Sequence, residues 1–168
     1  RLARALWWQL SKRALLWKKE VGADLQTVAF SPDGRTVAAG SMNQAIYVFD
    51  TQTRSMRVLR GHQDQLADVA FSPDGSRLVS MSQDNEVRLW ELSSGRSRSL
   101  RPFKGGGKGI AFSPDGKLLA MGGFDRKVRL WDLQRNRLRG VWSGHTGSVY
   151  TVAFSPGGAS SCARDTPP

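Results

Sequence analysis

The chain repeats itself with a period of about 41 residues, and this repeat limits the possible folds more than any other feature of the sequence. A seven-residue string that ends in Ser-Pro-Asp-Gly, or a close variant of it, begins four times, at Val28, Val69, Ile110 and Val152. An apolar and aromatic string keeps the same phase, at 45–50, 86–91 and 127–132. Such a chain builds one small unit several times, and neighbouring units bury each other's faces.

Each unit predicts four short strands. Thr27–Phe30 alternates between polar and apolar residues and meets the turn Ser31-Pro32-Asp33-Gly34. Proline suits an early turn position and glycine supplies a positive φ, so this string predicts a hairpin. Further strands are expected at 35–39, 46–49 and 56–60. Strands at this spacing, without a long helical period between residues 25 and 154, predict an all-β fold.

A lone four-stranded sheet of about 40 residues cannot cover both of its faces, whereas radial stacking of such sheets does so. The period, the Ser-Pro-Asp-Gly turns, Gly61-His62, Gly144-His145 and Leu130-Trp131-Asp132 resemble the WD40-repeat (WD-repeat) β-propeller family. The resemblance implies an interaction platform that is generally not an enzyme. It also implies about four blades' worth of four-stranded antiparallel sheets, a partial propeller.

The repeat phase divides the chain into units. We expect residues 1–24 to form the second half of a first blade and residues 159–168 to form an irregular tail. Between them lie repeat 1 (25–61), repeat 2 (62–103), repeat 3 (104–144) and the start of repeat 4 (145–158). The likeness to bacterial members, together with the start partway through a unit, favours a fragment of a longer protein. An alternative for the first segment is a basic amphipathic helix for a membrane surface.

One repeat contains serine, histidine and aspartate, which without context suggest nucleophilic catalysis. The resemblance implies instead a structural hydrogen-bonded tetrad, formed by His62, Ser80, Asp84 and Trp90. The third repeat keeps Asp125 and Trp131 but has Phe103 and Met121 at the His and Ser positions. The first repeat has Val21, Ala39, Asn43 and Phe49 at the four places, and the fourth keeps only His145. We expect apolar packing to replace the network there.

Composition argues against several other classes of protein. One cysteine excludes an intrachain disulfide, and with two histidines it argues against structural zinc. No run of 18 apolar residues indicates a membrane span. The string 104–109, Lys-Gly-Gly-Gly-Lys-Gly, lacks the spacing of a phosphate loop and precedes a strand. We expect no cofactor, no metal and a cytoplasmic location.

The net charge of +11 directs attention to acidic partners. A basic outer rim is predicted at Lys12, Arg13, Arg96, Arg98, Arg135 and Arg137. The face that carries the Gly-His loops offers candidate partner contacts at Gln63, Asp64, Phe103, Lys104, Lys108, Arg126 and Lys127. The leading hypothesis is a non-catalytic scaffold that binds proteins or peptides, as the sensing or docking part of a larger regulatory protein. A nucleic-acid-binding module that uses the rim is the alternative, and exposed blade edges suggest self-association.

Overall fold

The computed structural model describes the backbone of residues 3–9, 14–102, 106–157 and 161–165, and the side chains of 21–100 and 106–157. Every regular element in these ranges is a β-strand, so the predicted all-β fold is confirmed. Among the described residues, no helix has the length and apolarity to cross a bilayer.

Three four-stranded antiparallel sheets form the middle of the molecule. The first consists of β3 (Leu25–Phe30), β4 (Thr36–Ser41), β5 (Ala45–Asp50) and β6 (Met56–Arg60). The second consists of β7 (Leu66–Phe71), β8 (Arg77–Ser82), β9 (Glu86–Glu91) and β10 (Ser97–Pro102). The third consists of β11 (Gly107–Phe112), β12 (Leu118–Gly123), β13 (Lys127–Asp132) and β14 (Arg137–Ser143).

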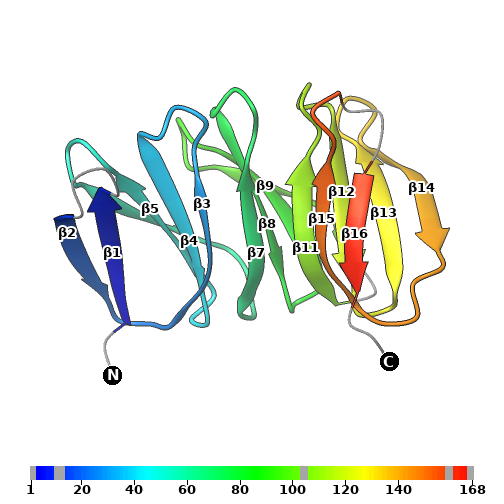
Figure 1. Cartoon of the computed structure of the whole chain (residues 1–168), viewed down its shortest axis with the longest axis horizontal. Helices are drawn as coiled ribbons and strands as arrows, with labels where there is room; N and C mark the ends of the chain where they lie inside the picture. The colour runs from blue at the N-terminus through cyan, green and yellow to red at the C-terminus, as the bar shows by residue number, and fades with distance from the viewer. Residues whose placement is uncertain (1–2, 10–13, 103–105, 158–160, 166–168) are drawn as a thin grey trace.

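A two-stranded sheet lies at each end of this row (Figure 1). At one end, β1 (Ala3–Gln9) pairs with β2 (Ala14–Val21), and at the other, β15 (Val149–Phe154) pairs with β16 (Ser161–Asp165). The strands β3, β7, β11 and β15 stand side by side along the row. The two end sheets lie at opposite ends, so the described strands form an open row rather than a closed ring (Figure 1).

The hairpin between the first two strands of each full repeat is held by the same pair of side chains, a serine and an aspartate. Ser31 Oγ donates to Asp33 Oδ1 at 2.6 Å, and the same carboxylate oxygen accepts the N–H of Arg35 at 3.0 Å. Gly34 has φ 69°, which a residue with a Cβ adopts at a cost. Equivalent serine-aspartate bonds recur in the other two full repeats, at Ser72–Asp74 and Ser113–Asp115. The Ser-Pro-Asp-Gly string therefore specifies the turn through its own side chains.

The core consists of apolar layers between neighbouring sheets. One layer joins the β3–β6 sheet to the β7–β10 sheet and includes Ile46, Leu78 and Trp90. The next layer joins the β7–β10 sheet to the β11–β14 sheet and includes Met81 and Leu119. Each sheet thus buries its face against the following one, as stacked repeats require.

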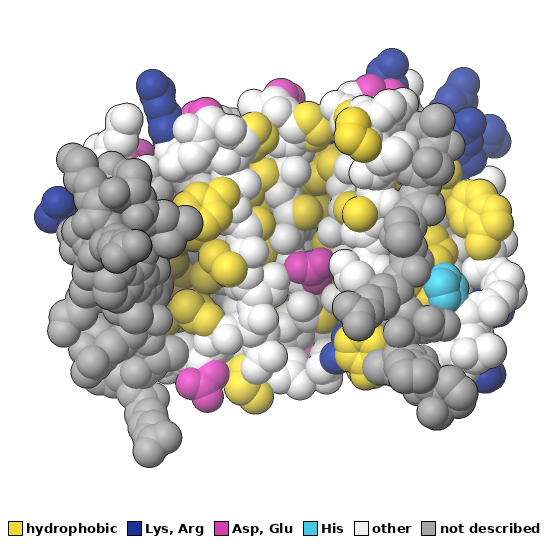
Figure 2. Space-filling view, viewed as in Figure 1, with side chains coloured by type: hydrophobic (Ala, Val, Ile, Leu, Met, Phe, Trp, Pro, Cys, Tyr) yellow, Lys and Arg dark blue, Asp and Glu magenta, His cyan; other side chains and the backbone are white. Residues whose placement is uncertain are grey.

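Apolar side chains remain exposed at the two ends of the stack. On β3, Val28 and Phe30 are 63% and 60% exposed. On the last full sheet, Trp142 and Val141 of β14 are about half exposed. Hydrophobic side chains are visible over the β3–β7 region in Figure 2. These faces lack the neighbouring full sheet that covers the middle sheets.

At the ends of the chain, one alternative does not hold and one expectation needs correction. Residues 3–9 and 14–21 pair as antiparallel strands, so the structure does not contain the alternative amphipathic helix. The irregular tail expected over 159–168 is wrong for residues 161–165, because these residues form β16 on the edge of β15. Strand pairing uses backbone groups, so a segment without an alternating apolar pattern can still complete a hairpin.

Candidate functional site

Repeat 2 brings the four tetrad residues into one chain of hydrogen bonds. His62 Nδ1 lies 2.8 Å from Asp84 Oδ2, and His62 Nε2 lies 2.8 Å from Ser80 Oγ. The indole Nε1–H of Trp90 donates to the same Ser80 Oγ at 2.7 Å. The chain links the loop before β7, strand β8, the β8–β9 turn and strand β9, so it ties three strands of one sheet together.

The geometry of this tetrad opposes nucleophilic catalysis. Ser80 is 0% exposed, so no substrate can approach its hydroxyl. Its oxygen accepts the indole proton, and its own proton is placed to bond to His62. Burial lowers the pKa of His62, and this effect outweighs the neighbouring Asp84 carboxylate, so the ring is held neutral. A buried network with a neutral histidine ring and satisfied hydrogen bonds stabilises the fold rather than reacting.

The carboxylate of Asp84 completes the network. It also accepts the backbone N–H groups of Gln63 and Glu86, each at 2.8 Å. Burial alone would raise the pKa of Asp84, but these bonds and His62 hold it below its usual value. Glu86 lies close enough to His62 and Asp84 for the three to hold a metal ion. Both ring nitrogens of His62 are already bonded and Glu86 pairs with Arg88 at 2.8 Å, so a metal would have to break the tetrad.

Repeat 3 has the same fold without the network. The indole Nε1 of Trp131 is buried and has no hydrogen-bond partner among the described residues. Met121, which stands at the Ser position, is buried beside it in the same apolar layer. Asp125 turns instead to Arg129, whose Nη1 donates to Asp125 Oδ1 at 3.0 Å. Apolar packing therefore replaces the tetrad only in part, because one buried donor is left without an acceptor.

Repeat 1 fills the tetrad positions in a third way. Val21, Ala39 and Phe49 are buried in one apolar cluster, as the sequence predicts. Asn43 bonds to the hydroxyl groups of Ser41 and Tyr47. Ser41 and Tyr47 lie outside the four tetrad positions, so those positions alone do not predict this polar group.

A second feature that the sequence analysis missed is a carboxylate shared by three neighbouring sheets. Asp68 of β7 accepts the hydroxyl proton of Thr27 on β3 at 2.9 Å and the backbone N–H of Ile110 on β11 at 3.0 Å. Burial raises its pKa despite these bonds. Thr27 and Asp68 are 41 residues apart, which is one repeat period, so they occupy equivalent positions in neighbouring repeats. This equivalence is the feature of the sequence that could have indicated the contact.

The candidate partner contacts that the structure describes lie at the end of the sheets that carries the Gly-His loops. Gln63, Asp64, Arg126 and Lys127 are exposed, and Lys108 is half-buried. His145, which precedes β15, is half-buried. Phe103 and Lys104 lie outside the described residues.

The predicted basic rim lies at the opposite end, with the Asp-Gly turns. Arg96 and Arg137 are exposed there. Arg98 donates to Asn136 at 2.7 Å, and Arg135 pairs with Asp132 at 3.0 Å. Lys12 and Arg13 lie outside the described residues. Figure 2 shows acidic side chains spaced along the upper edge and basic ones gathered toward β13 and β14.

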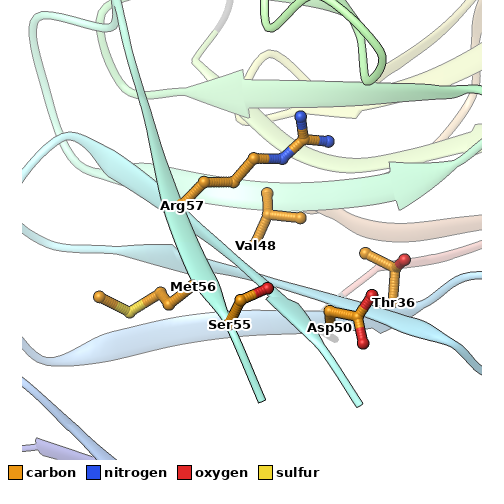
Figure 3. A pocket seen from close by; sticks show the side chains of 6 residues that line it. All are labelled: Thr36, Val48, Asp50, Ser55, Met56 and Arg57. Carbon is orange, nitrogen blue, oxygen red and sulfur yellow. The ribbon is translucent and has the colours of Figure 1, made fainter. Parts of the chain in front are cut away.

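Two shallow pockets open on this part of the molecule. One, of about 290 Å³, is lined by side chains from β4, β5, β6 and the residue before β6 (Figure 3): Thr36, Val48, Asp50, Ser55, Met56 and Arg57. The carboxylate of Asp50 accepts the backbone N–H groups of Gln52 and Thr53, at 2.9 and 2.7 Å, so it serves the turn. The other pocket, of about 310 Å³, lies between two Asp-Gly turns and is lined in part by Asp74. The hydrogen bond from the Ser72 hydroxyl helps to lower the pKa of Asp74 to about 2.

The stacked four-stranded sheets, their repeated turns and the buried tetrad define a protein built from β-propeller blades. The family model described as WD domain, G-beta repeat matches residues 21–50, 53–91, 103–132 and 136–166, which is more than half of the chain. The chain therefore belongs to the WD40 repeat family. A search of the curated proteins found no match.

Proposed function

We propose that this chain is a non-catalytic scaffold that binds a protein or peptide through the end of the sheets that carries the Gly-His loops. WD40 repeats generally mediate interactions between proteins. We place the chain in the cytoplasm, as the sensing or docking part of a larger regulatory protein, and its exposed end faces as sites of self-association.

This proposal rests on one observation: the repeats share the same backbone but carry different exposed side chains. The turn before the third strand has the same backbone in repeats 1, 2 and 3, with Gln44, Asn85 and Arg126 all at φ between 63° and 71°. Their side chains are uncharged in the first two repeats and basic in the third. A constant framework that carries different exposed side chains is suited to recognising one partner.

The nucleic-acid alternative has no comparable support. Of the described rim residues, Arg98 and Arg135 already bond within the chain. The rim is interrupted by the aspartates of the turns, which reduces the field that a phosphate backbone would meet.

Selection from a peptide-display library on the immobilised chain tests the proposal. The chain is first passed through a sizing column with light scattering at two concentrations, so that only a defined species of known mass is used. We expect a set of related peptides to be enriched and to remain bound at physiological salt. A single-stranded oligothymidylate serves as the comparison, because nucleic-acid binding falls steeply with salt. Enrichment of no peptide family, with salt-sensitive oligonucleotide binding, would contradict the scaffold.

A further inference from the structure

One corner of the molecule combines aromatic and basic side chains from four neighbouring segments. We call it the repeat-3 corner. It comprises Lys108 of β11, Phe124 and Arg126 of the β12–β13 turn, Lys127 of β13 and Tyr150 of β15. It lies at the same end of the sheets as the Gly-His loops, because the β12–β13 turn and the start of β11 share that end.

The centre of this corner is a lysine held between two rings. Lys108 Nζ lies 4.6 Å from the ring centroid of Phe124 and 5.2 Å from that of Tyr150. The two rings meet edge to face, with centroids 6.4 Å apart and an interplanar angle of 79°. Phe124 and Tyr150 are 44% and 46% exposed. The rings orient the ammonium group without neutralising it, so its charge stays available to a ligand.

The surrounding charge is positive. Arg126 and Lys127 follow Phe124 by two and three residues, and both are exposed. The carboxylate of the same turn, Asp125, is ion-paired with Arg129 and also attracts Lys127. One carboxylate of that turn, already ion-paired with Arg129, stands against the three cationic side chains of the corner, so the corner keeps a net positive charge.

The fold does not require these residues. At the register position of Lys108, repeat 1 has Gln26 and repeat 2 has Ala67. At the positions of Arg126 and Lys127, repeat 2 has Asn85 and Glu86. The same backbone is thus built elsewhere in the chain with neutral or acidic side chains. The corner is a local addition to the repeat, which is what a binding surface would be.

We propose that the repeat-3 corner binds an acidic peptide segment in which carboxylates flank an aromatic or large aliphatic side chain. The carboxylates would accept from Lys108, Arg126 and Lys127, and the apolar side chain would cover the exposed ring edges. A stack of nucleic-acid bases fits less well. One face of each ring is turned to the ammonium group, and Phe124 also lies against Gly106, where an added Cβ would be 2.5 Å from the ring. This inference rests on the scaffold function and names the partner for it.

The test repeats the peptide selection with three forms of the chain. The double variant Arg126→Asn, Lys127→Glu gives the turn the residues of repeat 2. The matched control, Arg96→Asn with Lys117→Glu, makes the same change in net charge at the opposite end of the sheets. The third form, Lys108→Met, keeps an unbranched apolar stem over the rings and removes the charge. Circular dichroism and thermal unfolding establish that each form is folded.

We expect the unmodified chain to enrich peptides with acidic residues beside an aromatic or leucine. For the strongest of these peptides, Lys108→Met and the double variant should each weaken binding by about tenfold or more, which is about 1.4 kcal/mol. The control should change it by less than about twofold, since screening limits remote charges. If the folded double variant binds the peptide as well as the unmodified chain, the proposed binding role of the repeat-3 corner is wrong, and the scaffold function is unaffected. Enrichment of no peptide at all overturns both. Displacement of the peptide by oligothymidylate at physiological salt assigns the corner to nucleic acid instead.

Discussion

Repeats 2 and 3 share one backbone but satisfy their buried polar groups differently. In repeat 2, Trp90 donates to Ser80 at 2.7 Å within a complete network. In repeat 3, Trp131 stands at the equivalent place on β13, and its indole nitrogen has no partner among the described residues. The strand registers around the two indoles correspond, with Leu78 opposite Trp90 and Leu119 opposite Trp131. The network is therefore not needed to form the sheet.

The difference shows what the network contributes. An apolar layer alone gives the four-stranded sheet, because Trp131 and Met121 are buried together in repeat 3. The tetrad adds a specific link between the loop before β7 and the strands behind it through His62. Where the link is absent, Asp125 is left to bind Arg129 and its turn carries Arg126 and Lys127. At the Gly-His end, repeat 2 carries the complete hydrogen-bond network and repeat 3 carries the exposed charge.

The largest expected difference between the repeats comes from removing the turn aspartate. Asp84→Ala should lower the free energy of unfolding by about 2–3 kcal/mol, because it leaves His62 and two backbone N–H groups without an acceptor. Asp125→Ala should cost about 1 kcal/mol or less, since its pair with Arg129 is partly exposed and screened. Urea unfolding of both variants measures the difference. Equal losses would mean that the tetrad is not the source of the extra stability.

A smaller difference is expected at the two indoles. Trp90→Phe should cost about 2 kcal/mol, because it removes ring volume and the bond to Ser80. Trp131→Phe should cost about 1 kcal/mol, since the lost volume is similar but an unsatisfied buried donor disappears with it. Thermal unfolding followed by circular dichroism compares the two. A larger loss at Trp131 would show that its indole nitrogen has a partner in solution.

The repeat and its hairpins were predictable because their determinants are local and recur in phase. Ser31, Asp33 and Gly34 fix the turn within a few residues, so the string alone predicts the strands on either side. The tetrad was predictable through the family resemblance, which supplies the roles of residues 18 to 22 positions apart. Spacing alone does not distinguish such a set from a catalytic one, and only the burial of Ser80 does so.

The missed features depend on contacts between sheets. Asp68 bonds to residues 41 and 42 positions away, and nothing within its own hairpin indicates those partners. The rings of Phe124 and Tyr150 come from successive repeats and meet only after stacking. The strand β16 was missed because residues 161–165 have no alternating apolar pattern, whereas pairing with β15 uses backbone groups. The sequence pattern predicts the features that a single repeat determines, whereas contacts between repeats are visible only in the structure.

The smallest expected difference between repeats 2 and 3 is in how their contribution to stability depends on pH. Burial lowers the pKa of His62 in the folded chain below its value of 6.5 in the unfolded chain. At a pH between these two pKa values, the unfolded chain therefore binds more protons than the folded chain. The stability that the neutral ring contributes is thus fully present above about pH 6.5 and is lost as the pH falls toward the folded pKa. The carboxylates with lowered pKa values, such as Asp74 at about 2, lose their contribution only below about pH 4, so the loss at His62 begins at a higher pH than the loss at the carboxylates.

His62→Gln tests this assignment, because glutamine keeps hydrogen-bonding groups at the site and does not titrate. We expect urea unfolding of the unmodified chain to show a shallow loss of stability as the pH falls from about 7 toward about pH 4, where the carboxylates begin to be protonated. The variant should be less stable at pH 7 and flatter across that range, and both proteins should weaken together below about pH 4. A slope that survives in His62→Gln would place the titrating group outside the tetrad, and the acid sensitivity would then not distinguish repeat 2 from repeat 3.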